Sequence, residues 1–537
     1  MSGVADYLID RLRTAGVRTL FGLPGGGGNL DLIQAAGRAG LPFVLTTTET
    51  GSAIAAIAQA EITGAPGACI TTLGPGAASV VNGIACAKLE RAPVLVITDS
   101  YASSGAAFDH QRVDHRALLA PVVKWSGSLA PFALQNIEEA LAQLAALPPG
   151  PVHLDCPADF EQAKDGGSFV VTDDVLVTSS HFEQLVSQAR RPLFIVGLGA
   201  RRDSDAREIR ALCKTHGVPA LVTYKAKGVI PDTHSWFAGV FTHGAIERAI
   251  IDQSDLLIGV GLDPVEILPR PWAYQQPIVS IAPWEMDVRH VPFSVQYVAP
   301  VAGALSALAG MLRTSTWDPT VVRAHAENAR RAVLTAGSDH PASNMSANPA
   351  STLTAQSVIT TAAAKFAGNA RVTVDAGAHM LPAMVLWPTS EPNEVLISNG
   401  LSTMGFALPA AIGAGLLDRS KPVIALTGDG GLLICMGELA TLARERLKVI
   451  VIVLNDSSLS LIEIKQQARK LPPAGVALGD LNWSRIAEGF GLSAWAARTP
   501  AELEHALEAA AAVDGPSLID AHIDRSNYPD IMKAIRG

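Results

Sequence analysis

Short runs of β-branched and other apolar residues alternate with helix-length segments along almost the whole chain of 537 residues. This alternation is typical of parallel sheets covered by helices, because a parallel strand reaches its neighbour through a crossover that is usually a helix. A chain of this length should form about three domains. The sequence therefore predicts an α/β protein with three doubly wound parallel-sheet domains.

The strand-like runs fall into three series. The first is "VRTLFGLPG", "PFVLTT", "GACITTLGPG", "APVLVITDS" and "GPVHLDCPADF"; the second is "RPLFIVGLGA", "VPALVTY", "SDLLIGVGL" and "QPIVSIAP"; the third is "ARVTVDAGAH", "VLISNG", "KPVIALTGDGG", "LKVIVIVLNDSS" and "PSLIDAHI". Between the last two series, charged helical runs lead into the loop-like "SDHPASNMSANPAS", which indicates a linker. We expect domains at residues 1–165, 180–315 and 352–537, with the linker at residues 316–351.

Composition limits the classes of partner. Apolar residues make up 48% of the chain and charged residues only 17%, which predicts large cores and a buried subunit interface. The net charge of −9, without a Lys/Arg cluster, argues against a nucleic-acid surface. The five cysteines lack metal-binding spacing, as in a reducing compartment. No window is apolar enough to span a bilayer and the N-terminus lacks a signal-peptide core, so we expect a cytoplasmic protein outside the membrane.

One carboxylate stands at the head of a run of small apolar residues, "TTTETGSAIAAIAQAEITGAPG". This residue, Glu49, could simply begin a helix that Thr48 caps, with its charge at the positive end of the helix dipole. Alternatively, the carboxylate is retained because its proton is used, since an unpaired buried charge is costly. The stretch by itself leaves both interpretations open.

The most specific motif lies in the third series, where a strand runs into "GDGG", a helix follows, and the next strand ends at "NDSS". Glycines at the carboxyl end of a strand let the backbone approach a phosphate. Asp429 adds an oxygen ligand that suits Mg²⁺, and Asp456 stands at the neighbouring strand end. Either motif alone could be a turn or a loop cap. The two together predict paired carboxylates at one rim of the sheet.

This arrangement resembles the thiamine-diphosphate signature of the enzymes grouped with acetolactate synthase and the 2-oxo acid decarboxylases. The resemblance covers the whole chain. "FGLPGG", "TETGSAIAAIA" and "TLGPGAASVVNGIACA" are similar to the pyrimidine-binding domain, "YKAKGVIPDTH" to the central domain, and "SNGLSTMGFALPAAIGA" to the segment before the diphosphate motif. It implies pyrimidine-binding, central and diphosphate-binding domains, in this order.

The resemblance also implies roles for individual residues. Asp429, the side chain of Asp456 and the carbonyl of Ser458 would hold Mg²⁺, although the family more often has Asn where Asp456 stands. Ala378 replaces a frequent polar residue, so its diphosphate contact would be through the backbone or be taken over by His379. The implied cofactor contacts are Glu49, Pro75, Gly377, Ala378, His379, Thr403, Met404, Gly428, Asp429, Gly430, Gly431, Asp456, Ser458, Leu461 and Ile462.

By the same resemblance, Glu49 shares a proton with a ring nitrogen of the cofactor's aminopyrimidine, which helps to remove the proton from the thiazolium carbon. Burial among Ala and Ile would raise its pKa toward the working pH of a general acid–base group. Met404 matches the apolar side chain that bends the cofactor. It can be a core methionine at the same time.

The residues near the reacting carbon bear on the reaction. Gln111 matches a family glutamine that faces the reacting group, and the setting "HQRVD" is more similar to the catabolic, flavin-independent acetolactate synthases. His110 either polarises the acceptor carbonyl or is an ordinary loop residue, and Gly26 and Gly27 would form an open floor or only a flexible loop. The chain has no His-His pair and has Ile462 where pyruvate decarboxylases have Glu, which favours carboligation over simple release of an aldehyde.

The resemblance implies thiamine diphosphate- and Mg²⁺-dependent decarboxylation of a 2-oxo acid, pyruvate being the expected donor, followed by joining to a carbonyl acceptor. The alternatives are a 2-oxo acid decarboxylase, a 2-hydroxy ketone or 2-hydroxyacyl lyase, and an inactive cofactor-binding paralogue. A homodimer or homotetramer with active sites at the subunit interface is expected. FAD or ADP in the central domain is possible but not favoured, because "GLGA" is a weak glycine signal.

Overall fold

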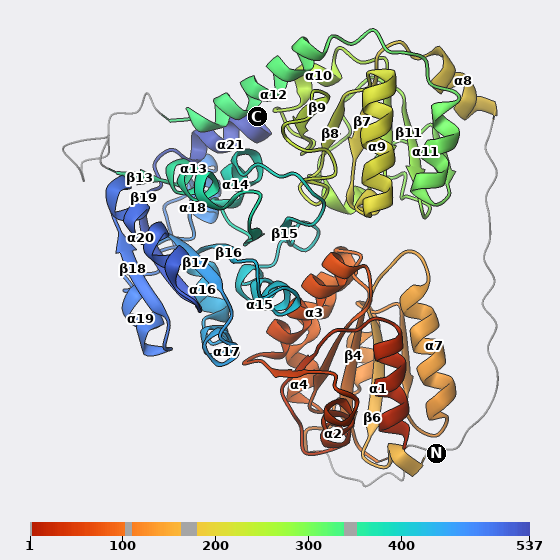
Figure 1. Cartoon of the computed structure of the whole chain (residues 1–537), viewed down its shortest axis with the longest axis vertical. Helices are drawn as coiled ribbons and strands as arrows, with labels where there is room; N and C mark the ends of the chain where they lie inside the picture. Colours follow the sequence, from red (N-terminus) through yellow and green to blue (C-terminus); the bar gives the residue numbers. More distant parts are fainter. Residues whose placement is uncertain (1–2, 103–109, 163–179, 338–351) are drawn as a thin grey trace.

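A computed structural model of the chain describes residues 3–102, 110–162, 180–337 and 352–537. Three lobes follow one another along the chain, and each is built on its own sheet (Figure 1). Every strand pair within these sheets is parallel. The prediction of three parallel α/β domains is confirmed.

The N-terminal domain has a six-stranded sheet in the order β2-β1-β3-β4-β6-β5. Its strands are β1 (Leu20–Gly22), β2 (Phe43–Leu45), β3 (Gly67–Thr71), β4 (Val94–Ser100), β5 (Trp125–Ser128) and β6 (Val152–Pro157). Its helices are α1 (Val4–Thr14), α2 (Asn29–Ala39), α3 (Glu49–Thr63), α4 (Pro75–Ser79), α5 (Val81–Leu89), α6 (His115–Leu119) and α7 (Ala133–Ala145).

The central domain has six strands in the order β12-β11-β10-β7-β8-β9, so the direction of winding reverses between β7 and β10. Its elements are α8 (Ser180–Gln188), β7 (Pro192–Val196), α9 (Asp203–His216), β8 (Ala220–Val222), β9 (Phe237–Val240), α10 (Arg248–Ile251), β10 (Leu256–Val260), β11 (Ile278–Ala282), β12 (Val295–Val298) and α11 (Val301–Ala309). In the expected linker, helix α12 (Pro319–Leu334) packs on β9.

The C-terminal domain has the strand order β13-β19-β17-β16-β14-β15, with β18 paired to β19. Its strands are β13 (Leu353–Thr354), β14 (Arg371–Val374), β15 (Val395–Ile397), β16 (Val423–Gly428), β17 (Val449–Asn455), β18 (Ser493–Ala497) and β19 (Ser517–Asp524). Its helices are α13 (Ala355–Phe366), α14 (Met380–Leu386), α15 (Ala407–Leu417), α16 (Asp429–Cys435), α17 (Glu438–Glu445), α18 (Ser460–Ala468), α19 (Trp483–Gly489), α20 (Pro500–Ala512) and α21 (Tyr528–Arg536).

Five strands are absent from the runs recognised in the sequence: β5, β9, β12, β13 and β18. Four of them are the edges of their sheets, and β18 pairs with β19 alone. They are short, and β5, β12 and β18 are largely half-exposed. These three strands bury less surface than a central strand, so they lack the long apolar run by which a buried parallel strand is recognised. β9 is buried but only four residues long, and β13 has two residues.

Helix α3 is buried along most of its length, because it packs against β1 and β3 on one side and against α15 of the C-terminal domain on the other. The orange α3 and the cyan α15 lie next to each other in Figure 1. The two helices approach closely: a Cβ on Gly413 would lie 2.3 Å from the carbonyl oxygen of Ala55. The small residues of α3 therefore join two domains, which is a structural reason for the apolar run behind Glu49.

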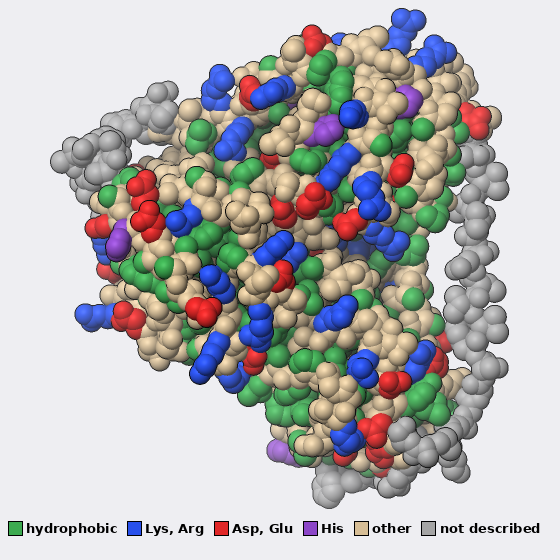
Figure 2. Space-filling model, in the orientation of Figure 1, with side chains coloured by type: hydrophobic (Ala, Val, Ile, Leu, Met, Phe, Trp, Pro, Cys, Tyr) green, Lys and Arg blue, Asp and Glu red, His purple; other side chains and the backbone are tan. Residues whose placement is uncertain are grey.

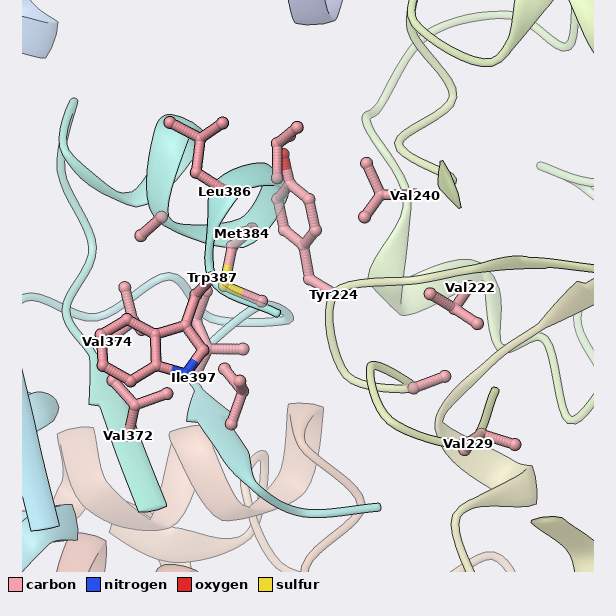
Figure 3. Packing of buried hydrophobic residues seen from close by; sticks show 14 of the residues in the cluster. Val222, Tyr224, Val229, Val240, Val372, Val374, Met384, Leu386, Trp387 and Ile397 are labelled. Carbon is pink, nitrogen blue, oxygen red and sulfur yellow. The ribbon is translucent and has the colours of Figure 1, made fainter. Parts of the chain in front are cut away.

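The central and C-terminal domains share a hydrophobic core. Tyr224 and Val240 of the central domain approach Met384 and Trp387 of the C-terminal domain, and all four side chains are buried (Figure 3). A second core joins the N-terminal and C-terminal domains through α3 and α15. The three sheets are thus held by shared cores rather than by linkers alone.

Three features of the described residues bear on the expectations from composition: the surface charges, the cysteines and the hydropathy of the helices. Acidic and basic side chains are interspersed on the face seen in Figure 2. All five cysteines are buried and unpaired. Within the ranges that the structure describes, no helix combines the length and the apolar character needed to cross a membrane.

Candidate active site

Asp429 and Asp456 lie at the carboxyl ends of neighbouring strands. β16 ends at Gly428, and Asp429 then begins α16; β17 ends at Asn455, immediately before Asp456. The register pairs Gly428 with Leu454, so the two carboxylates follow at the same edge of the sheet. This juxtaposition is the one that the two sequence motifs predict.

The electrostatics at this rim suit a cation. Asp429 is buried; its Oδ1 accepts a hydrogen bond from the amide of Gly430 at 2.8 Å, and its Oδ2 has no hydrogen-bond partner among the described residues. Burial, with a further contribution from the charge of Asp429, raises the pKa of Asp456 to about 7. Ser458 N and Ser460 Oγ donate to Asp456 at 3.0 and 2.7 Å.

These groups meet the requirements of Mg²⁺, which prefers a few protein oxygens together with phosphate oxygens. In the described residues, no group of three or more His, Cys, Asp or Glu side chains forms a metal-binding cluster. The two carboxylates stand at the rim, and the carbonyl of Ser458 as a third ligand is implied by the resemblance alone. One difference concerns Gly430, which resemblance assigned to the diphosphate: its amide already donates to Asp429.

His379 lies between the carboxyl ends of β14 and β16. A Cβ on Gly377 would lie 2.6 Å from the ring, and a Cβ on Gly428 would lie 3.2 Å from it, so both glycines make room for the imidazole. Burial lowers the pKa of His379 to about 4, against a hydrogen bond to the main chain of Asp375. Its Nε2 is buried without a partner among the described residues. Beside the apolar Ala378, this ring is a polar group that a phosphate could meet.

Asp375 directly follows β14, and it was not identified from the sequence as a candidate site residue. Its carboxylate accepts hydrogen bonds from the amides of Gly405 and Phe406 at 2.9 and 3.3 Å and from Thr427 Oγ1 at 3.0 Å. A Cβ on Gly431 would lie 2.7 Å from its Oδ2. Asp375 thus joins the loop after Met404 to the glycine turn of β16. The only signal was an Asp at the end of a strand-like run in "VTVDAGAH".

Met404 also reaches the glycine turn that follows β16. A Cβ on Gly430 would lie 3.4 Å from Met404 Cε, and the adjacent Thr403 accepts a hydrogen bond from Asn82 Nδ2 at 2.9 Å. Met404 is half-buried. Its side chain therefore borders the rim that carries Asp429.

Helix α18 covers another side of this rim. Leu461 is half-buried and Ile462 is exposed near its start. The neighbouring Glu463 accepts from Ser458 Oγ at 2.8 Å and forms an ion pair with Arg525 at 3.3 Å. Its carboxylate is thereby engaged with Ser458 and Arg525.

Glu49 begins α3, and Thr48 caps this helix by accepting a hydrogen bond from Gly51 N at 2.9 Å, as the sequence predicts. A Cβ on Gly76, just after Pro75 at the start of α4, would lie 3.1 Å from Glu49 Oε1. Burial, followed by the charge of Glu49, raises the pKa of the Cys69 thiol to about 12. In the single chain Glu49 is only partly buried, in contrast to residues 51–61 behind it.

Gln111 packs its backbone against the glycine turn before Pro75. A Cβ on Gly74 would lie 2.4 Å from the carbonyl oxygen of Gln111, and Gln111 itself has a φ of 56°. Both His110 and Gln111 are exposed. Gly26 has open space around its Cβ position, whereas Gly27 backs onto the carboxylate of Asp99.

A buried polar network supports this turn and was missed in the sequence. The amide of Gly74 donates to His115 Nε2 at 3.1 Å, and His115 Nδ1 lies 3.0 Å from Asp155 Oδ1. Thr98 Oγ1 also donates to Asp155 Oδ1 at 2.8 Å. These residues come from four separate segments of the chain, so no local sequence motif predicts their network.

The residues before Glu49 contact α17, whereas Asp429 begins the preceding helix, α16. Glu438 accepts hydrogen bonds from the amides of Thr47 and Thr48, immediately before Glu49. Asp429 starts α16, and Glu438 lies beyond its other end. The seven residues of α16 span about 10 Å. The segment that ends at Glu49 is thus bound to the start of α17 rather than to the start of α16, where Asp429 lies.

Models of three thiamine pyrophosphate enzyme domains match the chain. The N-terminal thiamine-pyrophosphate-binding domain matches residues 3–118, the central domain residues 180–308, and the C-terminal thiamine-pyrophosphate-binding domain residues 375–521. The chain belongs to the thiamine pyrophosphate enzyme family. Glu49, Gly74 and Gln111 fall within the matched N-terminal segment, and Asp429 and Asp456 within the matched C-terminal segment.

Similar proteins extend over nearly the full length. The catabolic acetolactate synthase of Raoultella terrigena is 27% identical over 98% of this chain and 96% of that protein. The large subunit of acetolactate synthase isozyme 2 of Escherichia coli K12 is 28% identical over 97% and 95%. In fold, the chain is similar to the thiamine diphosphate-dependent 4-hydroxybenzoylformate decarboxylase of Rhodococcus jostii RHA1, with a TM-score of 0.81, 20% identity, and coverage of 97% and 99%. The chain is thus a thiamine pyrophosphate-dependent enzyme.

Proposed function

We propose that this enzyme decarboxylates a 2-oxo acid, with pyruvate as the expected donor, and joins the product to a second carbonyl compound. The observation that carries this proposal is the buried Asp429 Oδ2, which has no partner among the described residues and lies beside Asp456, whose pKa is about 7. The names of the full-length relatives favour acetolactate synthase chemistry. A 2-oxo acid decarboxylase remains the second candidate, favoured by the name of the structural neighbour.

In this proposal Asp429, Asp456 and the carbonyl of Ser458 hold Mg²⁺. A divalent cation would lower the cost of ionising both carboxylates in one buried site. It would also bridge them to a diphosphate, with His379 and the glycine turn of β16 on the other side. Bound thiamine diphosphate supplies a nucleophilic thiazolium carbon and accepts the electrons released by decarboxylation.

The protein's own residues divide the remaining tasks. Met404 would contact bound cofactor as an apolar side chain, and Glu49 would hold and return a proton for its aminopyrimidine ring. Gln111 faces the reacting group, while His110 and the open Gly26 turn border the acceptor. Because the carboxylate of Glu463 is bound by Ser458 and Arg525, the site lacks this residue as a free proton donor, which favours a second carbonyl as the acceptor.

A homodimer, or a tetramer of such dimers, is part of the proposal. Asp429 begins α16, whereas the residues before Glu49 are bound to Glu438 at the start of α17, so in this proposal one complete site takes Glu49 from one subunit and Asp429 from the other. Large apolar side chains are exposed on or near the elements that carry these residues: Leu45, Ile434, Met436 and Ile462. A second copy would cover them and would complete the burial of Glu49.

The central domain needs no nucleotide in this proposal. Glu266 reaches the crevice between β7 and β10, where winding reverses and nucleotides bind in doubly wound sheets. Its Oε2 accepts from Leu198 N at 2.8 Å, its Oε1 from Thr223 Oγ1 at 2.5 Å, and a Cβ on Gly197 would lie 2.6 Å from Oε2. The chain's own carboxyl group thus occupies the glycine turn that a phosphate would use. A flavin or ADP released on denaturing purified protein would contradict this.

A cytoplasmic location also remains part of the proposal. All five cysteines are unpaired thiols, as in a reducing compartment.

The substitution Glu49→Gln tests the proposed chemistry, because Gln keeps the shape but cannot exchange the proton. Turnover should fall about 10²–10⁴-fold, the usual contribution of general acid–base catalysis. Exchange of the thiazolium proton for deuterium should slow while Mg²⁺-dependent cofactor binding persists. Exchange at the wild-type rate would return Glu49 to a helix-capping role. Release of CO₂ from a panel of 2-oxo acids, with and without an acceptor, separates carboligation from simple decarboxylation.

A further inference from the structure

Four charged groups form a cluster where the three domains meet, and three of them, Glu61, Glu90 and Lys225, are buried. Lys225 Nζ contacts Glu61 Oε1, lies 3.1 Å from Glu90 Oε2, and donates to the carbonyl of Ile397 at 3.0 Å. Arg201 lies 3.3 Å from the other oxygen of Glu61. Two cations thus balance two carboxylates, and of the four groups only Arg201 is partly exposed.

Each domain contributes to this cluster. Glu61 lies near the end of α3, and Glu90 follows α5 in the N-terminal domain; Lys225 and Arg201 belong to the central domain; and Ile397 ends β15 of the C-terminal domain. The neighbouring Tyr224 fixes the position of Lys225 by packing into the core shared with α14 (Figure 3). Burial opposes the charge of Lys225, but Glu61 and Glu90 outweigh it and raise its pKa.

The two glutamates differ in what their second oxygen binds. Glu61 uses it for Arg201. Glu90 uses its Oε1 to accept from Gly400 N at 2.9 Å, Ser398 Oγ at 3.1 Å and Leu401 N at 3.3 Å. Of the two glutamates, only Glu90 therefore accepts hydrogen bonds from the loop that follows β15.

That loop leads directly to the residues of the candidate site. Thr403 N donates to Ser398 Oγ at 3.2 Å, so a chain of hydrogen bonds runs from Glu90 through Ser398 to Thr403. The next residue is Met404, whose methyl group borders Gly430. Ser402, which immediately precedes Thr403, has a φ of 54°. A non-glycine residue rarely adopts this conformation unless its surroundings hold it.

A buried ion cluster of this kind is weak evidence for stability, because removing the charges from water offsets much of their attraction. The contacts of these charges instead fix geometry: Lys225 contacts one oxygen of Glu90, and the other oxygen accepts from several donors of the loop at once. We propose that Glu90, paired with Lys225, is a positioning residue that holds the loop of residues 398–404 so that Met404 meets the cofactor at the required angle. This inference rests on the proposed cofactor site.

The matched variants Glu90→Gln and Glu61→Gln test the proposal in the full-length protein. Each glutamate bridges two partners with its two oxygens, and a glutamine has only one oxygen, so both variants disturb the same Lys225. Both should lower the midpoint of thermal unfolding without cofactor. Only Glu90→Gln should raise the dissociation constant for thiamine diphosphate in Mg²⁺, by about tenfold, the effect of losing hydrogen bonds to a charged group. It should also slow deuterium exchange at the thiazolium carbon.

Equal effects of the two variants on cofactor affinity, or no effect of either, would overturn the proposal. If Glu90→Gln does not fold, Ser398→Ala decides, because it cuts the chain to Thr403 without removing a charge. This variant should also weaken cofactor binding, and unchanged affinity would refute the inference. A wild-type protein that fails to bind thiamine diphosphate would instead refute the proposed function itself, so the two failures are distinguishable.

Discussion

Asp456 stands beside Asp429 at the carboxyl ends of neighbouring strands, and burial together with the charge of Asp429 raises the pKa of Asp456 to about 7. Two carboxylates in such a site are costly without a cation. The pair therefore links the fold to the proposed binding of Mg²⁺.

Asp429→Ala should abolish Mg²⁺-dependent binding of thiamine diphosphate, because the diphosphate loses its bridge to the protein. Calorimetric titration of the variant with thiamine diphosphate, with and without MgCl₂, measures this binding. The exposed Asp514 offers a control, and Asp514→Ala should bind the cofactor normally. Normal binding by Asp429→Ala would exclude Asp429 as a metal ligand.

Mixing two inactive variants should restore activity if active sites are shared between subunits. A dimer of one Glu49→Gln chain and one Asp429→Ala chain has one site with both changes and one unchanged site. Random pairing of a twofold dimer then leaves about a quarter of all sites intact. Turnover after joint refolding measures the recovery. A mixture as inactive as its components would mean that both residues serve one site within a chain.

Glu266→Gln should change how stability depends on pH. Burial raises the pKa of Glu266 to about 8, whereas the unfolded chain ionises near its ordinary value of about 4.3. Between these values the unfolded state loses its proton first, so this group makes the wild-type protein less stable as pH rises. Gln cannot ionise, yet it can accept from Leu198 N and donate to Thr223 Oγ1.

The unfolding midpoint of Glu266→Gln relative to wild type should therefore rise from about pH 5 to about pH 8. The exposed Glu285 serves as a control, since Glu285→Gln should give a difference that stays flat over the same range. A flat difference for Glu266→Gln would show that Glu266 is ionised in the folded protein throughout.

Asp375→Asn should weaken both the fold and the cofactor site. The amide oxygen still accepts from Gly405 N, but the hydrogen bonds to a charged acceptor are lost and Thr427 Oγ1 must accept instead of donate, so the free energy of unfolding should fall by about 1–3 kcal/mol. Urea unfolding and cofactor titration measure the two effects. Asp205→Asn, which disturbs a buried hydrogen bond to Ala302 N in the central domain, should lower stability alone. Equal losses of cofactor affinity would remove Asp375 from the site.

Much of the architecture could be read from the sequence because its signals are local. A central parallel strand is a continuous apolar run, and β4, β16 and β17 were recognised as such. The carboxyl ends of parallel strands meet at one rim, so the order of the "GDGG" and "NDSS" motifs was enough to bring Asp429 and Asp456 together. The start of α3 at Glu49 followed from Thr48 as its cap.

The tertiary structure decided what depends on residues far apart in the chain. Edge strands such as β12 and β18 bury too little surface to leave an apolar run, and their existence depends on the strand beside them. Asp375 binds Gly405 and Thr427 from separate segments of one domain, and Lys225 joins Glu61 to Glu90 across two domains. Such contacts arise only when separate segments pack, because a side chain's partners in space carry no periodicity along the sequence.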